Sequence, residues 1–445
     1  MRRGIAAIVG RPNVGKSSFF NYLAGERISI VDDTPGVTRD RIYTRVEWLD
    51  REFTLIDTGG LEPESEDVIL KQMRLQAEIA METADVIILM VDAKTGLQPA
   101  DQDIADILRR SGKPVLVAVN KCDLPGDPPL SFYDFYGLGF SELFAISSAH
   151  GLGIGDLLDE VMQFFPEEED NGDEDSVIRV AIIGKPNVGK SSLVNRMVGQ
   201  DRAIVSDIPG TTRDATDTPI ENEHGSFILV DTAGMRRKSR IDDILERYSI
   251  MRATAAIEKA NVCVLLIDGA EGVSEQDTKI AGLAHNAGKG IVICVNKWDL
   301  PAEEKAETAE EMKRQVQETF AFMPYAEILF ISAKTGKKVD QLFATIVEVA
   351  QNCRKRIPTG RLNDLIGEAQ QMLQAPGYKG RRLKISYATQ VSVEPPTFIL
   401  FVNSVDLLHF SYERYLENQL RRAFGFGGTS IRFILREKGK KDTTS

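Results

Sequence analysis

The sequence contains the stretch Gly10-Arg11-Pro12-Asn13-Val14-Gly15-Lys16-Ser17 and repeats it, 174 residues later (184 − 10), as Gly184-Lys185-Pro186-Asn187-Val188-Gly189-Lys190-Ser191. Both copies fit the pattern G-x-x-x-x-G-K-[ST], in which glycines let backbone N–H groups wrap a phosphate chain. The lysine of this pattern neutralises the outer phosphates, and the serine hydroxyl reaches a magnesium ion. The candidate nucleotide-binding residues in the two loops are therefore Gly10, Asn13, Gly15, Lys16, Ser17 and Ser18, and Gly184, Asn187, Gly189, Lys190, Ser191 and Ser192.

Each copy stands in the sequence context that a phosphate-binding loop requires. The apolar runs Ile5-Ala6-Ala7-Ile8-Val9 and Val180-Ala181-Ile182-Ile183 come directly before the loops and predict buried strands. Apolar residues at helical spacing follow both loops, so that a helix dipole would add its positive end to the site. A glycine-rich structural turn is the alternative, but strand, loop and helix occur twice in the same order. The repeat therefore predicts a duplicated nucleotide-binding domain.

Four further motifs recur in the same order, which extends the duplication. The paired motifs are Thr38-Arg39-Asp40 with Thr212-Arg213-Asp214, Asp57-Thr58-Gly59-Gly60 with Asp231-Thr232-Ala233-Gly234, Asn120-Lys121-Cys122-Asp123 with Asn296-Lys297-Trp298-Asp299, and Ser148-Ala149 with Ser332-Ala333. The first two pairs are again shifted by 174 (212 − 38 and 231 − 57), and the third by 176 (296 − 120).

The first two motif pairs predict magnesium and terminal-phosphate contacts. A carboxylate that ends an apolar strand can hold magnesium through its water shell, as expected for Asp57 and Asp231. A threonine in a flexible segment can close on the ion when the terminal phosphate is present, and a glycine N–H can approach that phosphate. The expected magnesium ligands are Ser17, Thr38, Asp57, Ser191, Thr212 and Asp231, and the expected catalytic residues are Lys16, Thr38, Gly60, Lys190, Thr212 and Gly234.

The Asn-Lys-x-Asp motifs predict a preference for guanine. A carboxylate at Asp123 or Asp299 accepts from the two N–H donors of guanine, whereas adenine offers a ring acceptor there. Both motifs follow apolar strands, at the end where α/β sheets bind ligands. We expect backbone N–H groups at Ala149 and Ala333 to meet the guanine oxygen. The remaining base-binding candidates are Asn120, Lys121, Ser148, Asn296, Lys297 and Ser332.

With these motifs in place, the chain resembles the Der/EngA double-GTPase family of bacterial ribosome-assembly factors over nearly its whole length. The resemblance implies an α/β fold with two tandem P-loop GTPase domains, built on doubly wound mostly parallel sheets, followed by a small α+β KH-like domain. It implies GTP hydrolysis to GDP, magnesium, and association with the large ribosomal subunit during maturation. It also implies potassium stimulation, because Asn13 and Asn187 match the loop asparagine that coordinates the monovalent ion in this group.

One departure from Ras-like GTPases bears on the rate. Such enzymes carry a glutamine after D-x-x-G that orients the attacking water, but here Leu61 and Met235 stand there. Neither side chain can hydrogen-bond a water molecule. Our hypothesis is that each site hydrolyses GTP slowly alone and that potassium supplies the charge stabilisation of an arginine finger.

Composition shifts predict the domain boundaries. We expect GTPase domains at 1–166 and 177–351, a KH-like domain at 352–437 and a basic, polar tail at 438–445. The acidic run at 167–176 cannot bury itself and predicts an extended linker, although mimicry of nucleic acid is an alternative.

The C-terminal region carries the opposite charge from the rest of the chain. Residues 352–445 hold 16 Lys+Arg and 8 Asp+Glu (net +8), which leaves 38 and 58 (net −20) for residues 1–351. A basic domain on an acidic body indicates contact with phosphate. Its apolar pattern predicts the order α-β-β-α-β, which resembles a KH domain. Candidate RNA contacts are Arg381, Arg382, Lys384, Arg421, Arg422, Lys438, Lys440 and Lys441.

The KH-like domain departs from its family at the loop that normally grips RNA. Gly425-Phe426-Gly427-Gly428 has the letters G-x-x-G, but it follows the last long helix instead of joining two helices. We interpret it as a helix stop and turn. A domain-packing role for this region is the rival of RNA binding.

Other function classes fit the sequence less well. A metabolic P-loop kinase would need an acceptor-substrate domain, and a membrane-remodelling GTPase would need an amphipathic basic helix; neither is evident. A GTP-dependent scaffold with one structural site stays open. The four cysteines show no metal spacing and predict buried reduced thiols, and no apolar run is long enough to span a membrane. We expect a cytoplasmic, monomeric GTPase switch that contacts rRNA of the large subunit, with an activating protein as a further candidate partner.

Overall fold

A computed structural model describes residues 3–26, 43–49, 51–58, 66–165, 177–199, 217–231, 245–300, 308–378 and 380–437. The chain divides into two compact units. The first contains residues 1–171 together with 237–259, and therefore includes the helix α7 (Leu245–Lys259). The second contains residues 172–236 and 260–445.

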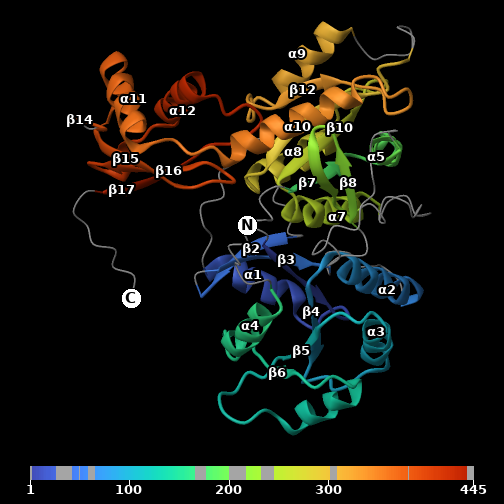
Figure 1. The fold of residues 1–445 in the computed structure, drawn as a ribbon. Coiled ribbons are helices and arrows are strands. Elements are labelled where there is room, and N and C mark those ends of the chain that lie inside the picture. Colours follow the sequence, from blue (N-terminus) through green and yellow to red (C-terminus); the bar gives the residue numbers. More distant parts are fainter. Residues whose placement is uncertain are drawn as a thin grey trace. The chain divides into compact units, whose positions relative to one another are not determined.

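The first unit carries the expected strand, loop and helix at its start. Strand β1 ends at Val9 and helix α1 begins at Lys16, so that the glycine-rich loop lies between them. Its elements are β1 (Gly4–Val9), α1 (Lys16–Glu26), β2 (Tyr43–Trp48), β3 (Arg51–Asp57), α2 (Glu66–Thr83), β4 (Val86–Asp92), α3 (Pro99–Arg109), β5 (Val115–Asn120), the 3-10 helix η1 (Leu130–Leu138), β6 (Leu143–Ala145) and α4 (Ile154–Gln163) (Figure 1).

The sheet of the first unit is covered by helices on both faces. Its strand order is β2-β3-β1-β4-β5-β6, and all neighbours are parallel except β2 and β3. Successive residues of β1 point to opposite faces, so Ile8 packs with residues of α1 and α4 while Val9 packs with residues of α2 and α3. Strand β1 lies between β3 and β4, where the strand order reverses. Ligands of such sheets bind at the carboxyl ends of the strands beside this point.

The second unit repeats this topology. Its sheet has the order β12-β11-β10-β7-β9-β8, with β8 and β9 antiparallel and the other neighbours parallel. The duplication inferred from the motifs is thus confirmed by the fold. The elements are β7 (Val177–Ile183), α5 (Lys190–Val198), β8 (Thr218–Asn222), β9 (Gly225–Leu229), β10 (Val262–Asp268), α8 (Glu275–Asn286), β11 (Gly290–Asn296), α9 (Ala309–Thr319), β12 (Glu327–Phe330) and α10 (Val339–Arg354).

The C-terminal part of the second unit has the expected order α-β-β-α-β. Strands β15 and β16 pair antiparallel, β16 and β17 pair parallel, and the apolar face of this sheet packs against α11 and α12. The short strands β13 and β14 and the 3-10 helix η4 were not anticipated. The elements are α11 (Thr359–Met372), β13 (Gly377–Tyr378), β14 (Arg381–Arg382), β15 (Ile385–Ser392), β16 (Thr397–Val402), η4 (Val405–Leu407), α12 (Phe410–Phe424) and β17 (Arg432–Glu437).

Candidate nucleotide-binding sites

The lysine of the first glycine-rich loop is buried and held by the loop itself. The Nζ atom of Lys16 donates to the backbone carbonyls of Gly10 and Arg11, at 2.6 and 2.8 Å. Only 7% of Lys16 is exposed. The ammonium group is therefore positioned by the loop backbone, at the start of α1 where a helix dipole favours anions.

The second loop holds its lysine in the same way. The Nζ atom of Lys190 donates to the carbonyls of Gly184 and Lys185, at 2.8 and 2.7 Å. Burial lowers the pKa of Lys190 from its ordinary value of 10.5 to about 8, although the nearby Asp277 carboxylate acts in the opposite direction. An anion placed beside this lysine would favour its charged form.

A side-chain amide joins each Asn-Lys-x-Asp motif to the phosphate-binding loop. Asn120 donates from Nδ2 to the carbonyl of Val14, and Asn296 donates to the carbonyl of Val188, both at 2.8 Å. A Cβ atom at Gly15 would lie 2.2 Å from the Asn120 Nδ2. The loop therefore needs glycine at this position both for its close approach and for its φ of +100°.

The lysine of the Asn-Lys-x-Asp motif makes a second connection, to an aspartate that the sequence reasoning missed. Lys121 Nζ donates to Asp92 Oδ2 at 2.7 Å and to the carbonyl of Asn13 at 2.9 Å. Lys297 donates to Asp268 Oδ2 at 2.5 Å. Burial by itself raises the pKa of Asp92, but the hydrogen bonds from Lys121 and the backbone lower it below its ordinary value.

A signal for the missed pair was present in the sequence. Asp92 and Asp268 both end buried apolar strands, β4 and β10, and they are 176 residues apart (268 − 92), like the Asn-Lys-x-Asp motifs. A carboxylate that closes an apolar strand indicates a functional position, because the ligand-binding edge of the sheet lies there.

Asp123, the aspartate expected to recognise the base in the first site, has partners within the protein. Asp123 accepts from Lys94 Nζ at 2.6 Å and from the Ser147 hydroxyl at 2.8 Å. The side-chain hydrogen bond from Lys94, followed by that from Ser147, lowers the pKa of Asp123. The second site has Ala270 where the first has Lys94, since each lies two residues after the strand-ending aspartate (94 − 92 and 270 − 268).

The hydrogen bonds correct the alignment of the Ser-Ala motifs. The N–H of Ser148 donates to Asn120 Oδ1, and the N–H of Ala333 donates to Asn296 Oδ1, both at 2.9 Å. Ser148 thus corresponds to Ala333, and Ser147 to Ser332, so that pairing Ala149 with Ala333 was wrong by one residue. The serine doublet permitted both alignments, and only the backbone contacts distinguish them. The contact of these N–H groups with guanine stays a prediction.

Four of the six expected magnesium ligands lie within the described residues, and all four carry side-chain oxygen atoms: Ser17, Asp57, Ser191 and Asp231. Asp57 ends β3 and is 3% exposed. It lies in register with Ile8 of β1, two residues before the first glycine of the loop. Ser17 and Ser191 lie exposed in the first turns of α1 and α5. The N–H of Asp231 donates to Asp217 Oδ1 at 3.1 Å. Carboxylate and hydroxyl oxygens fit magnesium, which prefers oxygen ligands.

Several expected site residues lie outside the residues that the structure describes, and their roles stay predictions. These residues are Thr38, Gly60, Leu61, Thr212, Gly234 and Met235. Of the candidate RNA contacts, Lys438, Lys440 and Lys441 also lie outside.

The loop with the letters G-x-x-G attaches the KH-like domain to the second GTPase domain. The N–H of Ile291, in β11, donates to the carbonyl of Gly428 at 2.7 Å, and the N–H of Gly428 donates to the carbonyl of Tyr325 at 2.8 Å. Phe426 is fully buried. Helix α12 ends at Phe424, and Gly425 follows with a φ of +89°, which confirms the helix stop and turn.

The candidate RNA contacts differ in whether their side chains are exposed to solvent or already bound within the protein. The guanidinium of Arg421 donates to the carbonyls of Phe426 and Thr429 and pairs with Glu417, so it belongs to the domain contact. In contrast, the remaining candidates within the described residues are exposed: Arg381, Arg382, Lys384 and Arg422.

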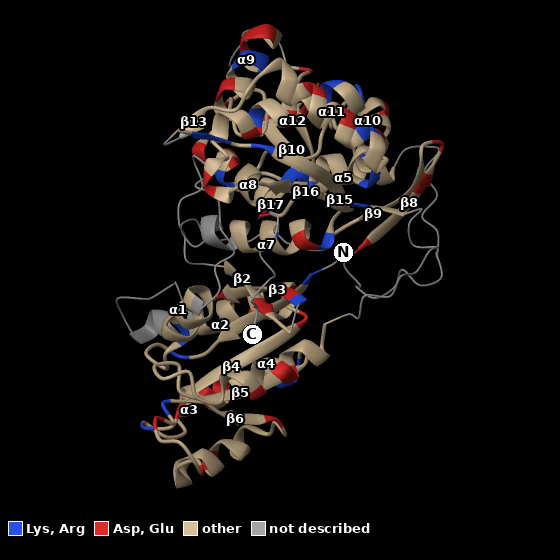
Figure 2. Cartoon of the chain, turned by 90° about the vertical axis from the view of Figure 1, so that its left-hand side faces the viewer, with Lys and Arg blue, Asp and Glu red and all other residues tan. Residues whose placement is uncertain are grey.

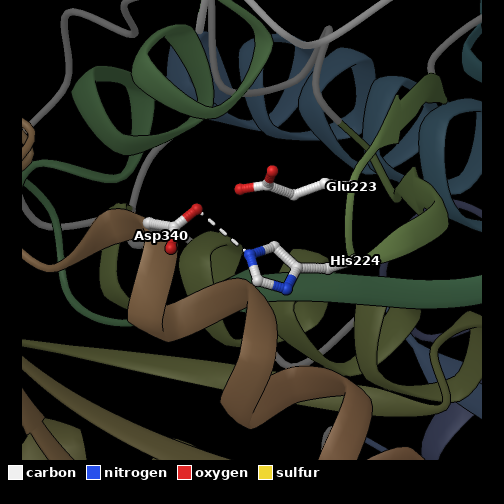
Figure 3. Close-up of side chains that lie close together, drawn as sticks. All are labelled: Glu223, His224 and Asp340. Atoms are coloured by element: carbon white, nitrogen blue, oxygen red, sulfur yellow. Dashed lines mark hydrogen bonds and ion pairs between the residues drawn. The ribbon is translucent and has the colours of Figure 1, made fainter.

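A third cluster of polar side chains lies away from both nucleotide motifs. Figure 3 shows Glu223 and His224, from the turn between β8 and β9, beside Asp340 in the first turn of α10. The His224 Nε2 lies 3.0 Å from Asp340 Oδ1, and its ring stacks on Phe343. Although the three groups have the spacing of metal ligands, Glu223 and Asp340 are exposed. We interpret the cluster as a structural contact that holds the hairpin to the helix.

Two expectations drawn from composition can be compared with the structure. All four cysteines are free and buried, as expected, and burial raises the pKa of Cys353 to about 11. Among the described helices, none has the length and apolar character needed to cross a membrane.

Two doubly wound sheets with the same loop geometry, joined to a KH-like domain, define a protein with two tandem GTPase domains. Family models agree: residues 5–121 and 179–297 match the 50S ribosome-binding GTPase family, and residues 356–436 match the KH-domain-like C-terminal domain of EngA bacterial GTPase enzymes. The chain belongs to the GTPase Der family. It is accordingly a GTPase that binds GTP and GDP.

Curated relatives support this assignment over the whole chain. GTPase Der of Acetivibrio thermocellus is 61% identical over 441 residues, which cover 99% of this chain and 100% of the relative. GTPase Der of Ruminiclostridium cellulolyticum is 58% identical over 442 residues, with the same coverage. The structure of Era in complex with MgGDPNP and nucleotides of 16S ribosomal RNA is 23% identical. It covers 60% of this chain and 94% of its own at a TM-score of 0.31, too low to support an argument about function.

Proposed function

We propose that the chain is a GTP-hydrolysing switch in ribosome biogenesis, which promotes maturation of the large (50S) subunit through nucleotide-dependent association with rRNA. The proposal is carried by one observation: both GTPase domains match a family described as 50S ribosome-binding GTPase. The net charge of +8 (16 − 8) on residues 352–445 supports a phosphate-rich partner. We further propose that the protein acts as a cytoplasmic monomer. Its proposed domains are two GTPase domains, at residues 1–166 and 177–351, and a KH-like domain at residues 352–437.

In this proposal, corresponding residues of the two sites have the same roles in hydrolysis. Lys16 and Lys190 neutralise charge on the outer phosphates, and the glycine-rich backbone orients the phosphate chain for in-line attack by water. Hydrolysis forms a bond from the water oxygen to the terminal phosphorus and breaks the bond to the bridging oxygen, which leaves with GDP. The N–H groups of Gly60 and Gly234 stabilise the transferring group.

Base selection in the proposal rests on Asp123 and Asp299. Asn120 and Asn296 support it by holding the base-binding motif against the phosphate-binding loop, at the distances given above. Preorganised groups of this kind lose little entropy when the ligand binds.

In the proposal, magnesium would be held by Ser17, Asp57 and Thr38 in the first site and by Ser191, Asp231 and Thr212 in the second. When bound, it neutralises charge that develops on the phosphate oxygens. The proposal assigns potassium to Asn13 and Asn187, whose side chains are exposed at the loops where φ is +65° and +64°. Turnover that is equally fast in sodium and potassium buffers would remove potassium from the proposal.

The test is sedimentation of the full chain with purified large ribosomal subunits in GDP, GTP or a non-hydrolysable GTP analogue. Lys16→Ala and Lys190→Ala each remove the lysine of one glycine-rich loop, so that the two sites are tested separately. Small ribosomal subunits serve as the control particle. We expect binding with triphosphate and loss of binding in at least one variant, which would identify the gating site.

Equal binding in every nucleotide state would exclude a GTP-controlled association. Absence of binding to large subunits in all nucleotide states would contradict the proposed role in ribosome biogenesis. It would not affect the assignment of the chain as a GTPase.

A further inference from the structure

The sheet of the KH-like domain has one face that is covered and one that is open. On the covered face, Ala388 and Leu400 belong to the core with α11 and α12, and the partly buried Leu435 packs against it. Because side chains alternate along a strand, the neighbouring residues point the other way. Tyr387 and Ile434 accordingly remain 46% and 44% exposed.

The open face carries a pair of aromatic rings in one row. Tyr387 of β15 pairs with Phe401 of β16, and Phe401 pairs with Arg436 of β17. The Tyr387 and Phe401 rings have centroids 5.8 Å apart and planes inclined by 47°. In the next row, Ile399 is in register with Ile434. Ile399 is buried, at 9% exposed, so that Ile434 alone extends the exposed apolar surface in this row. A large exposed aromatic beside an aliphatic patch is typical of a binding surface.

Basic residues lie at the end of this row and in the segment before β15. Arg436 is exposed at the end of the row, and Arg381, Arg382 and Lys384 are exposed in the segment that leads into β15. Figure 2 shows this basic segment beside β13, where Lys and Arg are blue. Cations around apolar rings complement a ligand that has flat faces and a negatively charged backbone.

The stretch with the letters G-x-x-G, Gly425-Phe426-Gly427-Gly428, is not available to grip RNA here. A Cβ atom at Gly428 would lie 2.2 Å from Val349 Cγ2, because this stretch packs against the second GTPase domain. Phe426 is fully buried in the core of the KH-like domain. An RNA contact of this domain would therefore not use this stretch.

We propose that the open face of β15, β16 and β17 is a stacking platform for single-stranded RNA. Bases stack on Tyr387 and Phe401, while Arg436 and Lys384 contact the phosphates. Duplex RNA is a poor ligand, because its bases stack on one another inside the helix. The inference rests on the proposed function and identifies the strandedness of its RNA partner and the residues that meet it.

The test measures binding of the full chain to a fluorescein-labelled, single-stranded RNA of about twelve mixed nucleotides by fluorescence anisotropy. We expect Tyr387→Ala to weaken binding about tenfold and Tyr387→Phe, which keeps the ring, to preserve it. Tyr133→Ala is the matched control, since Tyr133 is 53% exposed in the first unit and should leave RNA affinity unchanged. Melting temperatures of the variants establish that they are folded.

Two further readouts separate stacking from charge attraction. Tyr387→Trp should keep the affinity and lose fluorescence when single-stranded RNA binds, which contact with phosphates alone would not cause. Arg436→Gln should reduce the dependence of the affinity on salt, because one phosphate contact is lost.

The platform is overturned if the native chain binds duplex and single-stranded RNA equally well, if it binds neither, or if Tyr387→Ala binds single-stranded RNA with native affinity. It is also overturned if a photo-crosslinker at position 387 captures a ribosomal protein instead of RNA. Sedimentation of the native chain with large subunits is measured in parallel. Nucleotide-dependent sedimentation together with any of these results would leave the proposed function standing and remove only the platform.

Discussion

Asn296 donates from its side-chain amide to the backbone carbonyl of Val188, 2.8 Å away, and so joins two motifs that lie 108 residues apart in the chain. The same amide group sets the space available to Gly189, because a Cβ atom there would lie 2.3 Å from the Asn296 Nδ2. One contact therefore couples the Asn-Lys-x-Asp motif to the glycine-rich loop.

Replacement of this glycine should disable the second site. Gly189→Ala is expected to lower the affinity of that site for GDP about a hundredfold, because the methyl group collides with Asn296 and the φ of +102° strains any other residue. Calorimetric titration of the Lys16→Ala background would measure the second site alone. Gly225→Ala is the control, since its φ is also positive and nothing lies within 4 Å. Native affinity in Gly189→Ala would contradict the observed geometry.

Lys94 should make the first site bind guanine nucleotides less tightly than it otherwise would. Lys94→Ala removes the 2.6 Å partner of Asp123, so we expect affinity for GDP to rise about twofold to fivefold. A fluorescent GDP analogue titrated into the Lys190→Ala background would measure this. The reciprocal change, Ala270→Lys, should lower affinity at the second site, and a change of the same sign in both variants would refute the idea.

The pH dependence of the second site should follow Lys190. Its pKa is lowered to about 8, and bound phosphates favour the charged form, so binding takes up a proton above this pH. Affinity for GDP should then fall by up to about tenfold per pH unit above about 8. Calorimetry in buffers of different ionisation enthalpy at one alkaline pH would measure the proton uptake; its absence would show that Lys190 stays charged.

The lowered pKa of Lys190 also predicts how the free energy of unfolding of the nucleotide-free protein changes with pH. A lysine whose pKa is lower in the folded state disfavours folding while it is protonated. The free energy of unfolding should therefore rise as pH increases from about 8 towards the ordinary value of 10.5. Urea denaturation across this range should show a smaller rise in Lys190→Met, which has no group to titrate.

Gly428→Ala should weaken the attachment of the KH-like domain to the second GTPase domain. Its Cβ would lie 2.2 Å from Val349, so we expect a loss of about 1–3 kcal/mol in the free energy of unfolding. Gly380→Ala is a closely matched control, because both glycines have a φ of +75° but Gly380 has open space around it. Equal losses in the two variants would attribute the effect to backbone strain and not to the domain contact.

Much of the fold could be predicted because its signals are local. Apolar runs such as Ile5-Ala6-Ala7-Ile8-Val9 became buried strands, and the helical spacing around Leu193 became α5. The C-terminal order α-β-β-α-β was also correct, since each element carries its own apolar period. The very short β13 and β14 were missed because two residues show no periodicity.

Parts of the candidate site could not be predicted with the same method. The place of Asp92 at the end of an apolar strand was a signal that went unused. Its ion pair with Lys121, 29 residues away, could not be predicted, because the pair forms only once β4 and β5 lie side by side. The alignment of Ser148 with Ala333 likewise depended on hydrogen bonds to two asparagines. A serine doublet offers two registers to the sequence, and only the backbone geometry distinguishes them.

By itself the sequence determined that the chain has two GTPase domains and a basic KH-like domain, because glycine spacing, apolar periodicity and charge are properties of neighbouring residues. Only the tertiary structure decided that Gly425-Phe426-Gly427-Gly428 is a contact between domains, and that Tyr387 and Phe401 share one open row. Both features are contacts between segments that are distant in the sequence. Burial and strand register determine such contacts only once the whole chain has folded.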